Sequence, residues 1–389
     1  MNPKLIFYDP IYQKIVIDDK LIKALIFTSE FQRLKNINQL GMLSILRDWT
    51  RYTRFSHCLG VYHLLDMLFQ KEIFRDISDQ EKTEVKIAGL LHDLGHGPFS
   101  HTFEKLLPGF AHEQYSRQLI QDSQGEIFPL LKKHNLNVER ICNLILNHTT
   151  NDWGQKIISG QFDFDRLDYL IRDCHFTGWQ LNLGSANRLI DNLQLINHEL
   201  VFDEKAILYV ENYLIFRFYI YKQLFWNHKN LLLEGVLKNI FIRLRDLRQQ
   251  KTISFDCAKF QFLLTQTLPS LNAFRHLDDH DLFTFLKELQ LATTDHVLRI
   301  LIAVILKPTA AYEELFSADA EVLQHFPTSE HKYFTYSSNR EIVIYRTGNA
   351  EIKFINANQE IKKLSEISLF FNESKIYQKK LKIYLKTRF

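Results

Sequence analysis

The 389-residue chain is poor in the residues that most often interrupt regular structure. Its 13 glycines and 8 prolines together make up roughly 5% of the residues, whereas these two residue types make up about 12% of an average globular chain. Its four cysteines are scattered, with no Cys-x-x-Cys pair: Cys58, Cys142, Cys174 and Cys257. The shortage of turn-forming residues favours long helices over many short strands, and the cysteine spacing indicates neither a disulfide framework nor a thiolate zinc site.

The chain also lacks a strong charge bias and a long apolar run. Its net charge of +3 is too small to indicate nucleic-acid binding, because duplex-binding domains usually show a much stronger basic bias. The longest apolar segment, Ile300–Leu306, is far shorter than the roughly 20 residues of a membrane span. Asp9-Pro10 lies where a signal peptide needs its apolar stretch. We therefore expect a soluble, cytoplasmic protein with no membrane partner.

Apolar residues recur at helical spacing through most of the sequence, including a stripe that runs from Leu21 to Ile37 and stops at Gly41. Residues 4–18 alternate weakly and indicate an extended lead-in or a small hairpin. The pattern predicts helices over 53–70, 80–93, 100–107, 112–121, 138–148 and 163–174, and a very long helical tract over 205–250 interrupted only by Gly235.

Two regions show strand signals. Residues 193–202 predict a small β-hairpin, and period-two alternation beyond Lys332 predicts strands over 333–336, 341–345 and 351–355. The fold class is thus mainly helical, with a small β-hairpin and a small C-terminal α+β lobe. We divide the chain into an N-terminal segment and helix, a metal-binding core, a helical extension and the C-terminal lobe, at residues 1–50, 51–180, 181–325 and 326–389.

Three stretches place imidazoles and carboxylates in helical settings: Arg54–His57, His92–His101 and Asp163–Tyr169. A single histidine in an apolar helix is usually a core or surface residue, but here several such groups occur together. Their separation along the chain means that they come from different helices, as in metal sites built inside helical bundles. We predict that one metal ion is bound by four residues: His57, His92, Asp93 and Asp165.

His92 and Asp93 are neighbours, and neighbouring side chains on a helix diverge by roughly 100°. Both reach one cation only if it lies off the helix end, where the Gly95–Pro98 break opens the backbone. Two imidazoles and two carboxylates suit a divalent transition ion such as Mn, Fe, Co, Ni or Zn better than a bare Mg or Ca site. Such an ion activates water and polarises a phosphoryl oxygen. The pattern therefore predicts metal-dependent cleavage of a phosphate ester.

Candidate catalytic groups follow the metal motif. His101 and Glu104 are three residues apart and share a helix face, where the carboxylate fixes the imidazole tautomer for general acid–base catalysis. A solvated surface pair is the alternative. His112 opens the next helix, a position that favours anions, and His96 lies on the metal loop, where we expect a phosphate contact.

Other side chains are candidates for holding the substrate. Arg54 and Arg166 offer planar guanidinium groups to phosphate, with a surface ion pair as the alternative for Arg54. Tyr169 lies four residues after Asp165, on the same helix face, in position to contact a sugar.

Six segments of the first half of the chain carry a family resemblance: DPIY (9–12), EFQRLKNINQLG (30–41), TRFSHCLGVYHL (53–64), IAGLLHDLGHGPFSHTFE (87–104), AHEQ (111–114) and FDFDRLDYLIRDCHFTG (162–178). Together they resemble the HD-domain phosphohydrolases, and within them the deoxynucleoside triphosphate (dNTP) triphosphohydrolase branch. The resemblance implies an all-α HD-domain fold. It also implies a reaction that breaks the bond between the α-phosphate and the 5′ oxygen, giving a deoxynucleoside and triphosphate.

The resemblance implies roles by position. It gives the same four metal ligands, catalytic roles for His101, Glu104 and His112, and phosphate contacts for Arg54 and Arg166. The residues that it places around the deoxyribose, where a 2′-hydroxyl would be crowded, are Gln39, Leu40, Tyr169 and Asp173. It implies one divalent transition metal, with Mg accompanying the nucleotide as an option, and a homo-oligomer. The tract over 205–250 supplies that interface or is a buried core helix.

Some positions depart from the family pattern. Nucleotide-activated members carry an Asp and an Arg where this chain has Phe27 and Lys35, so guanine-nucleotide activation does not carry over. Trp226 replaces a tyrosine that gates the sugar, and Phe218 replaces an arginine. Two alternative functions therefore stay open: a phosphodiesterase acting on cyclic or other nucleotides, and a regulator that binds nucleotide or nucleic acid without turnover.

Overall fold

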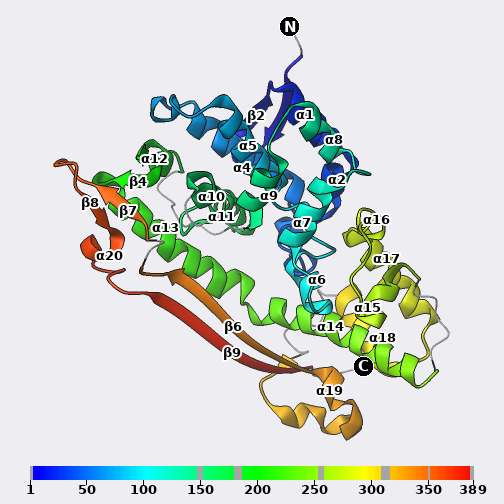
Figure 1. The fold of residues 1–389 in the computed structure, drawn as a ribbon. Coiled ribbons are helices and arrows are strands. Elements are labelled where there is room, and N and C mark those ends of the chain that lie inside the picture. The colour runs from blue at the N-terminus through cyan, green and yellow to red at the C-terminus, as the bar shows by residue number, and fades with distance from the viewer. Residues whose placement is uncertain are drawn as a thin grey trace.

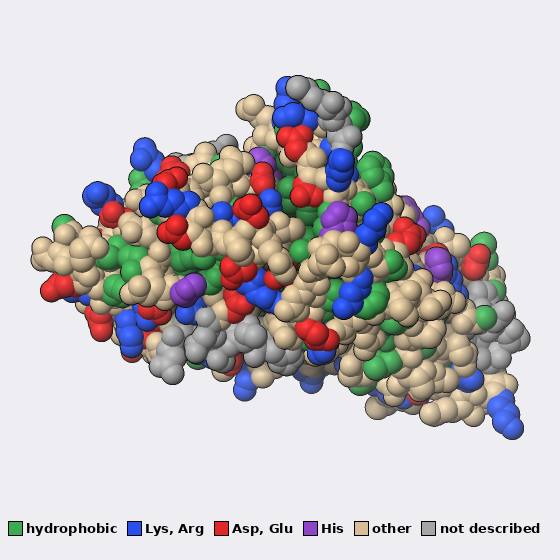
Figure 2. Space-filling model, turned by 45° about the horizontal axis from the view of Figure 1, so that its top comes forward, with side chains coloured by type: hydrophobic (Ala, Val, Ile, Leu, Met, Phe, Trp, Pro, Cys, Tyr) green, Lys and Arg blue, Asp and Glu red, His purple; other side chains and the backbone are tan. Residues whose placement is uncertain are grey.

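The structure, a computed structural model, describes residues 3–146, 152–178, 186–252, 258–307, 316–348 and 351–385. These residues are mainly helical and carry a few small sheets, which confirms the predicted fold class. Figure 1 shows a helical body with two long strands running along one side of it. Among the described helices, none is both long and apolar enough to cross a membrane. Figure 2 shows basic and acidic side chains interspersed over the face in view.

The N-terminal residues form the small hairpin, in which β1 (Leu5–Asp9) pairs antiparallel with β2 (Gln13–Ile17). The apolar stripe that follows does not make one helix. It is divided at Thr28, whose extended backbone ends α1 (Lys20–Phe27) and whose hydroxyl accepts a hydrogen bond from the Phe31 amide to cap α2 (Ser29–Gln32). The predicted continuous stripe is therefore wrong in this detail.

The helices of the predicted core lie within a few residues of their expected positions: α4 (Arg54–Phe69), α5 (Asp79–Leu91), α6 (His101–Leu106), α7 (His112–Gln121), α9 (Val138–Leu146) and α11 (Phe164–Thr177). The predicted extension of α9 to residue 148 lies outside the described residues. Side-chain caps start three of these helices: Thr53 for α4, Ser78 for α5 and Asp163 for α11. Gly178, at φ 71°, ends α11. Local sequence thus fixes where the core helices begin and end.

Gly60 allows α4 and α11 to pack closely. A Cβ at this position would lie 1.9 Å from Asp168 Oδ1 and 2.5 Å from Arg172 Nη2. No side chain larger than hydrogen fits there without moving a buried ion pair, because Asp168 and Arg172 are both fully buried. This contact brings the third motif stretch against the first.

The long tract predicted over 205–250 is broken at a different place than expected. α13 (Ile207–Ile220) runs into a π-turn over Tyr221–Phe225, and α14 (His228–Gln249) begins after Asn227, whose side chain accepts a hydrogen bond from the Lys229 amide. The expected interruption at Gly235 is wrong. Gly235 lies inside α14, where a Cβ would come within 2.1 Å of the Tyr336 ring, so this glycine makes room for a strand.

That strand is β6 (Thr335–Tyr345), which pairs antiparallel with β9 (Lys375–Leu385) and packs on α13 and α14 (Figure 1). The short β5 (Phe316–Ser317) completes the sheet order β5-β9-β6. Of the predicted strands, the one over 341–345 is part of β6. Tyr333 and Phe334 instead end helix α19 (His331–Phe334), and β9 was not predicted.

The hairpin at 193–202 is confirmed as β3 (Leu193–Ile196) and β4 (Glu199–Asp203), and it is extended by two C-terminal strands. β7 (Lys353–Ile355) pairs parallel with β4, and β8 (Ile361–Lys363) pairs antiparallel with β7. The C-terminal strands therefore pack on the middle of the chain. The domain boundaries proposed from the sequence stay predictions.

The remaining helices are short connections or belong to the region before β5: α3 (Leu43–Leu46), α8 (Ile127–Lys133), α10 (Trp153–Ser159), α12 (Ala186–Asp191), α15 (Gln261–Thr265), α16 (Leu271–Phe274), α17 (Asp279–Ala292), α18 (His296–Leu306) and α20 (Leu364–Ile367). Asp278 caps α17 in a capping box, and Asp295 caps α18.

Replacement of Gly60 by alanine should destabilise the fold. We expect Gly60→Ala to lower the free energy of unfolding by about 3 kcal/mol or more, because the methyl group would displace a buried ion pair. Urea unfolding measures this loss. Gly109→Ala is the control: Gly109 has φ +83° with open space around it, so only backbone strain of about 1–2 kcal/mol is expected. Equal losses in both variants would contradict the packing argument.

Candidate metal centre

The four predicted metal ligands come from three helices that meet at one point. His57 lies in the second turn of α4, and Asp165 lies in the first turn of α11. His92 is the C-cap of α5, and Asp93 follows it. The adjacent pair therefore sits off the end of its helix, where the partial negative charge of the helix C-terminus favours a cation.

The donor atoms of these residues converge. His57 Nε2 lies 3.3 Å from His92 Nε2 and 3.0 Å from Asp165 Oδ1, and His92 Nε2 lies 3.5 Å from Asp165 Oδ1. Asp93 adds oxygens 3.3 Å from His92 Nε2 and 3.7 Å from His57 Nε2. An ion about 2.1 Å from each donor would separate neighbouring donors by roughly 3.0–3.4 Å. The spacing therefore fits a single ion.

In each imidazole Nδ1 is bonded on the side away from this centre. His57 Nδ1 lies 2.8 Å from Asp168 Oδ2, and His92 Nδ1 lies 2.8 Å from the Gly89 carbonyl oxygen. Since a carbonyl can only accept, His92 Nδ1 carries a proton and donates it. Asp168 likewise holds a proton on Nδ1 of His57. Both Nε2 atoms therefore face the two carboxylates, where either a proton on Nε2 or a metal cation satisfies them.

The charges of these groups support this assignment. Burial opposes a charged His57, but hydrogen bonds to Asp165 and Asp168 outweigh it and raise the pKa of this imidazole to about 9. Burial also opposes the ionised form of Asp93, yet Arg54 beside it holds the pKa of Asp93 well below its usual range. For Asp165, hydrogen bonds from His57 and His92 outweigh burial and lower the pKa. The carboxylates are ionised and draw positive charge to this point.

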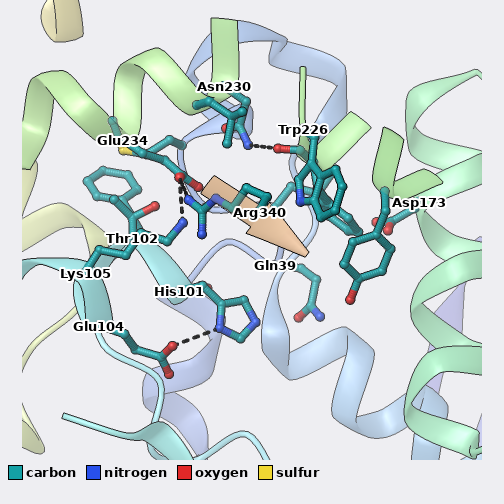
Figure 3. Close-up of a pocket in the computed structure, with 18 of the residues that line it drawn as sticks. Gln39, His101, Thr102, Glu104, Lys105, Asp173, Trp226, Asn230, Glu234 and Arg340 are labelled. Carbon is teal, nitrogen blue, oxygen red and sulfur yellow. Dashed lines mark hydrogen bonds and ion pairs between the residues drawn. The ribbon is translucent and has the colours of Figure 1, made fainter. Parts of the chain in front are cut away.

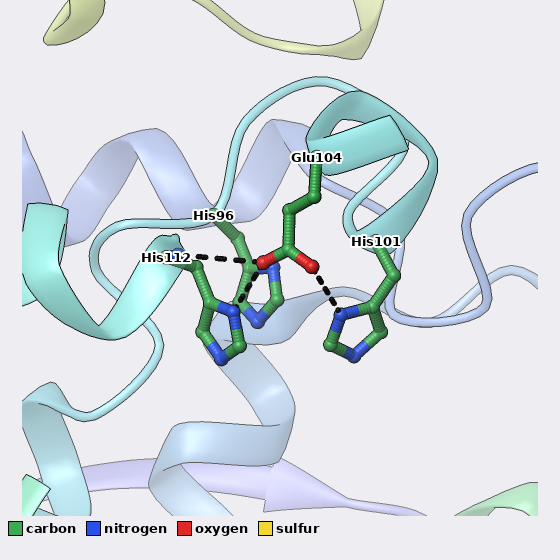
Figure 4. Close-up of side chains that lie close together, drawn as sticks. All are labelled: His96, His101, Glu104 and His112. Atoms are coloured by element: carbon green, nitrogen blue, oxygen red, sulfur yellow. Dashed lines mark hydrogen bonds and ion pairs between the residues drawn. The ribbon is translucent and has the colours of Figure 1, made fainter. Parts of the chain in front are cut away.

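A second cluster of ionisable groups lies beside the first (Figure 4). Glu104 Oε2 is 3.2 Å from His101 Nδ1, while Oε1 binds His112 Nδ1 and accepts the His112 amide at 3.3 Å. His96 stacks on His112 with ring centroids 3.9 Å apart, and its Nε2 is 3.2 Å from Asp93 Oδ1. The four residues lie within metal-ligand reach of one another, but Glu104 is committed to the two imidazoles that flank it.

The burial and charge of the second cluster suit acid–base chemistry. The His101 side chain is 61% exposed, whereas that of His96 is 1% exposed. Burial and the nearby Arg54 charge hold the pKa of His96 well below its usual range. Burial opposes ionisation of Glu104, but hydrogen bonds from His101 and His112 lower its pKa. Glu104 binds both imidazoles, and of the two rings His101 is the accessible one.

A pocket of about 300 Å³ adjoins the metal centre (Figure 3). Seven of the predicted site residues line it: Gln39, Leu40, Arg54, His101, Glu104, Tyr169 and Asp173. Arg54 joins the two regions, because its Nη1 binds Asp93 Oδ2 at 2.5 Å and its Nε binds Ser100 Oγ at 2.8 Å. Three of the seven predicted residues each have a buried polar atom without a hydrogen-bond partner: Gln39 Oε1, Tyr169 OH and Asp173 Oδ2.

Two residues predicted to contact phosphate are placed elsewhere. The Arg166 guanidinium binds the Asp163 carboxylate and the Gly160 carbonyl oxygen, the latter at 2.8 Å, so it closes the start of α11. Neither Arg166 nor His96 is among the residues that line the pocket. Arg166 therefore forms an ion pair in this structure, and phosphate binding would require it to leave Asp163.

Sequence reasoning missed the residues that support the ligands. Asp168 accepts hydrogen bonds from His57 and also from Tyr12 OH at 2.8 Å and Arg172 Nε at 2.7 Å. Arg172 in turn binds Asp9 at 2.8 Å. The spacing of Asp168 and Arg172, four residues apart on one helix, was the available signal.

The pocket wall contributed by the second half of the chain was also missed, apart from Trp226. Asn230, Glu234 and Arg340 line the pocket with Trp226, but no spacing in the sequence connects Arg340 with the other residues, because it comes from β6.

Comparison with known proteins agrees with this geometry. Residues 54–173 match the family described as HD domain. The chain is 30% identical over 404 residues to the uncharacterized protein MG461 of Mycoplasma genitalium, covering 95% of this chain and 94% of that protein. It is 34% identical to the deoxynucleoside triphosphate triphosphohydrolase SAMHD1 of Homo sapiens, over 45% of this chain and 33% of that protein.

A solved structure supports the same relationship. The crystal structure of a phosphohydrolase from Bacteroides thetaiotaomicron superposes with a TM-score of 0.84 and 27% identity, covering 99% of this chain and 100% of that one. The similarity therefore extends over the C-terminal strands as well as the helical core.

Removal of the Asp168 carboxylate, which binds His57 Nδ1, should weaken metal binding. We expect Asp168→Asn to lower the affinity for Mn²⁺ by about 10- to 100-fold, because the His57 tautomer and orientation are no longer fixed by a carboxylate. Isothermal titration with Mn²⁺ measures the change. Tyr12→Phe removes a different hydrogen bond from Asp168 and should leave the affinity within a few-fold of wild type. An unchanged affinity in Asp168→Asn would contradict the assignment.

Proposed function

The chain belongs to the HD-domain phosphohydrolase superfamily, and on this basis we propose that it hydrolyses deoxynucleoside triphosphates to a deoxynucleoside and inorganic triphosphate. One observation carries the proposal. His57 Nε2, His92 Nε2 and Asp165 Oδ1 lie within 3.5 Å of one another, and Asp93 oxygens lie 3.3 and 3.7 Å from the two imidazole nitrogens. Arg54 connects this centre to a pocket large enough for a nucleotide.

We assign the metal site to His57, His92, Asp93 and Asp165, holding one divalent transition ion such as Mn, Fe, Co, Ni or Zn. When bound, the ion supplies Lewis acidity, which lowers the pKa of water from 15.7 toward about 7 and polarises a phosphoryl oxygen. Mg²⁺ accompanies the nucleotide. Arg54 is fixed at the boundary by Ser100 and Asp93, where its charge offsets negative charge that develops on the α-phosphate.

His101 is the general acid in this proposal. The oxygen of water adds to the α-phosphorus, the bond from phosphorus to the 5′ oxygen breaks, and His101 Nε2 donates the proton that the leaving oxygen takes. Glu104 holds His101 at Nδ1, which leaves Nε2 as the donating atom and stabilises the protonated ring. His112 shares the Glu104 carboxylate and keeps it in place. The water proton passes to solvent.

The pocket wall suits a deoxyribose. Asp173 Oδ1 accepts the Tyr52 hydroxyl at 2.6 Å, while its buried Oδ2 has no partner and is available to a 3′-hydroxyl. Tyr169 OH and Gln39 Oε1 are likewise unpartnered, and Leu40 supplies an apolar surface for the ring. A substrate that satisfies these atoms removes the cost of leaving them unpaired. The activity stated in the name of human SAMHD1 is in keeping with this proposal.

The cellular location and the oligomeric state are proposed from the same family. We propose a cytoplasmic homo-oligomer acting on a nucleotide substrate, with no membrane partner. The metal centre, being complete in all four ligands, favours an enzyme over a regulator without turnover.

The catalytic proposal is tested by a double substitution of the adjacent ligands. We expect His92→Ala with Asp93→Ala to reduce triphosphate release from dNTPs, assayed with Mn²⁺, by at least about 10³-fold, because the ion that lowers the pKa of water is lost. His296→Ala is the control, since His296 is exposed and pairs with Glu330 far from the pocket. Undiminished release in the double variant contradicts the proposal.

A nucleotide panel separates the alternatives. Ribonucleotides and cyclic nucleotides are assayed beside the dNTPs, and the proposal expects inorganic triphosphate from dNTPs. Turnover of cyclic nucleotides alone would support a phosphodiesterase. Tight dNTP binding without product over hours would support a regulator.

The pH dependence of sugar recognition tests the role of Asp173. Burial raises the pKa of Asp173 to about 7, although the hydrogen bond from Tyr52 acts against this shift. A 3′-hydroxyl that donates to Oδ2 favours the ionised form, so affinity for it should rise as pH increases toward 7 and level off above. We expect the ratio of kcat/KM for dNTP over dideoxy-NTP to rise between pH 6 and about 7.5.

The matching variant is Asp173→Asn, in which this ratio should not change with pH. A ratio that is flat in the wild-type enzyme would exclude Asp173 as the acceptor of the 3′-hydroxyl.

A further inference from the structure

One part of the pocket is not used by the proposed reaction. It is formed by Trp226, which precedes α14, by Asn230 and Glu234, which lie four residues apart on one face of α14, and by Arg340 from β6. Figure 3 shows Arg340 reaching across toward Glu234. We call these four residues the α14–β6 wall.

Asn230 presents a free acceptor to this part of the pocket. Its Nδ2 donates to the Phe225 carbonyl oxygen at 3.0 Å, which fixes the orientation of the amide. Its Oδ1 is therefore an acceptor, and this atom is buried without a partner. The whole residue is only 5% exposed. A buried acceptor of this kind costs free energy unless a ligand donates to it.

Glu234 and Arg340 add a second acceptor and a donor. Lys105 Nζ and Arg340 Nη2 both bind Oε2 of Glu234, at 2.6 and 2.7 Å, which leaves Oε1 available. Arg340 Nε is buried and has no hydrogen-bond partner. The α14–β6 wall therefore offers two acceptors, Asn230 Oδ1 and Glu234 Oε1, beside the guanidinium of Arg340, whose Nε is an unpartnered donor.

Trp226 supplies an aromatic surface at the same place. Its ring is stacked on Tyr377 of β9 with centroids 5.6 Å apart and planes 21° apart, and it packs with Leu231 and Ile342. These packing contacts fix the position of the indole, which also lines the pocket. Bases stack on aromatic side chains of this kind with about 1–3 kcal/mol each.

We propose that the α14–β6 wall recognises guanine. The Watson–Crick edge of guanine presents two N–H donors, at N1 and the 2-amino group, and one acceptor, O6. Thymine presents one donor between two acceptors, cytosine one donor and two acceptors, and adenine one donor and one acceptor. Guanine is the only one of the four bases with two separate N–H donor groups on this edge, so it alone satisfies both acceptors of the wall while O6 meets the Arg340 guanidinium. The inference rests on the proposed function, because it names the base of the same substrate.

The inference is tested by kcat/KM for the four dNTPs and for dITP, which is dGTP without the 2-amino group. We expect the wild-type enzyme to prefer dGTP over dTTP by about tenfold or more, since one good set of base hydrogen bonds discriminates to this extent. Glu234→Gln should reduce the dGTP to dTTP ratio at least about fivefold.

dITP reports on a single hydrogen bond. The wild-type enzyme should use dGTP better than dITP, and this difference should vanish in whichever variant has lost the acceptor of the 2-amino group, Asn230→Ala or Glu234→Gln. Persistence of the difference in both variants would overturn the assignment.

Asp246→Asn is the matched control. Asp246 lies on the same helix and pairs with Lys332 at 2.6 Å, the length of the Lys105–Glu234 pair, but it does not line the pocket. The order of preference among the bases should be the same in this variant as in the wild type. If the Glu234→Gln effect came only from losing an ion pair on α14, Asp246→Asn would change the order of preference in the same way.

The results separate failure of the inference from failure of the proposed function. Equal kcat/KM for all four dNTPs, or a Glu234→Gln effect that is the same for all of them, overturns guanine recognition while the hydrolase stands. Absence of triphosphate from every dNTP contradicts the proposed function. In that event, calorimetric binding of dGMP and TMP tests the base alone: at least about tenfold tighter dGMP binding supports the inference, and equal affinities overturn it.

Discussion

Nitrogen and oxygen atoms of His57, His92, Asp93 and Asp165 are turned toward one point, and the packing of the first half of the chain holds them in that position. Asp168 binds Nδ1 of His57, which directs Nε2 toward this point. Asp168 is fixed by Arg172 and Tyr12, and Gly60 lets α4 approach this pair closely. The N-terminal hairpin and α11 thus act on the metal centre through one buried carboxylate. Because a bound ion would replace the protons on Nε2, metal binding is coupled to the protonation of these imidazoles.

The second half of the chain completes the site rather than extending the molecule away from it. The Tyr336 ring packs over Gly235, which lays β6 across α14 and brings Arg340 to Glu234. The π-turn at Tyr221–Phe225 redirects the chain before α14, so Trp226 faces the pocket. The proposed metal ligands and catalytic histidines therefore come from the helical core, while the groups that we propose select the base come from α14 and β6. On this proposal, chemistry and selectivity are carried by different parts of the chain.

The proposed metal centre can be predicted from the sequence because its signals are local. Adjacent His92 and Asp93 at a helix end, and caps such as Thr53 and Asp163, fix positions without knowledge of the tertiary fold. The break before α14 could not be found this way, since no glycine or proline marks it and the turn is capped by Asn227. Arg340 and Glu234 are 106 residues apart and are joined only by tertiary packing. The predicted phosphate contact of Arg166 leaves out Asp163, which lies three residues earlier and binds the Arg166 guanidinium at the start of α11.

Anomalous diffraction from crystals grown with Mn²⁺ tests the central claim most directly. The account predicts one strong peak about 2.0–2.3 Å from His57 Nε2, His92 Nε2 and carboxylate oxygens of Asp93 and Asp165, with both Nδ1 atoms still bonded to Asp168 and Gly89. A peak among His96, His101, Glu104 and His112 instead, or no peak at saturating Mn²⁺, would contradict it.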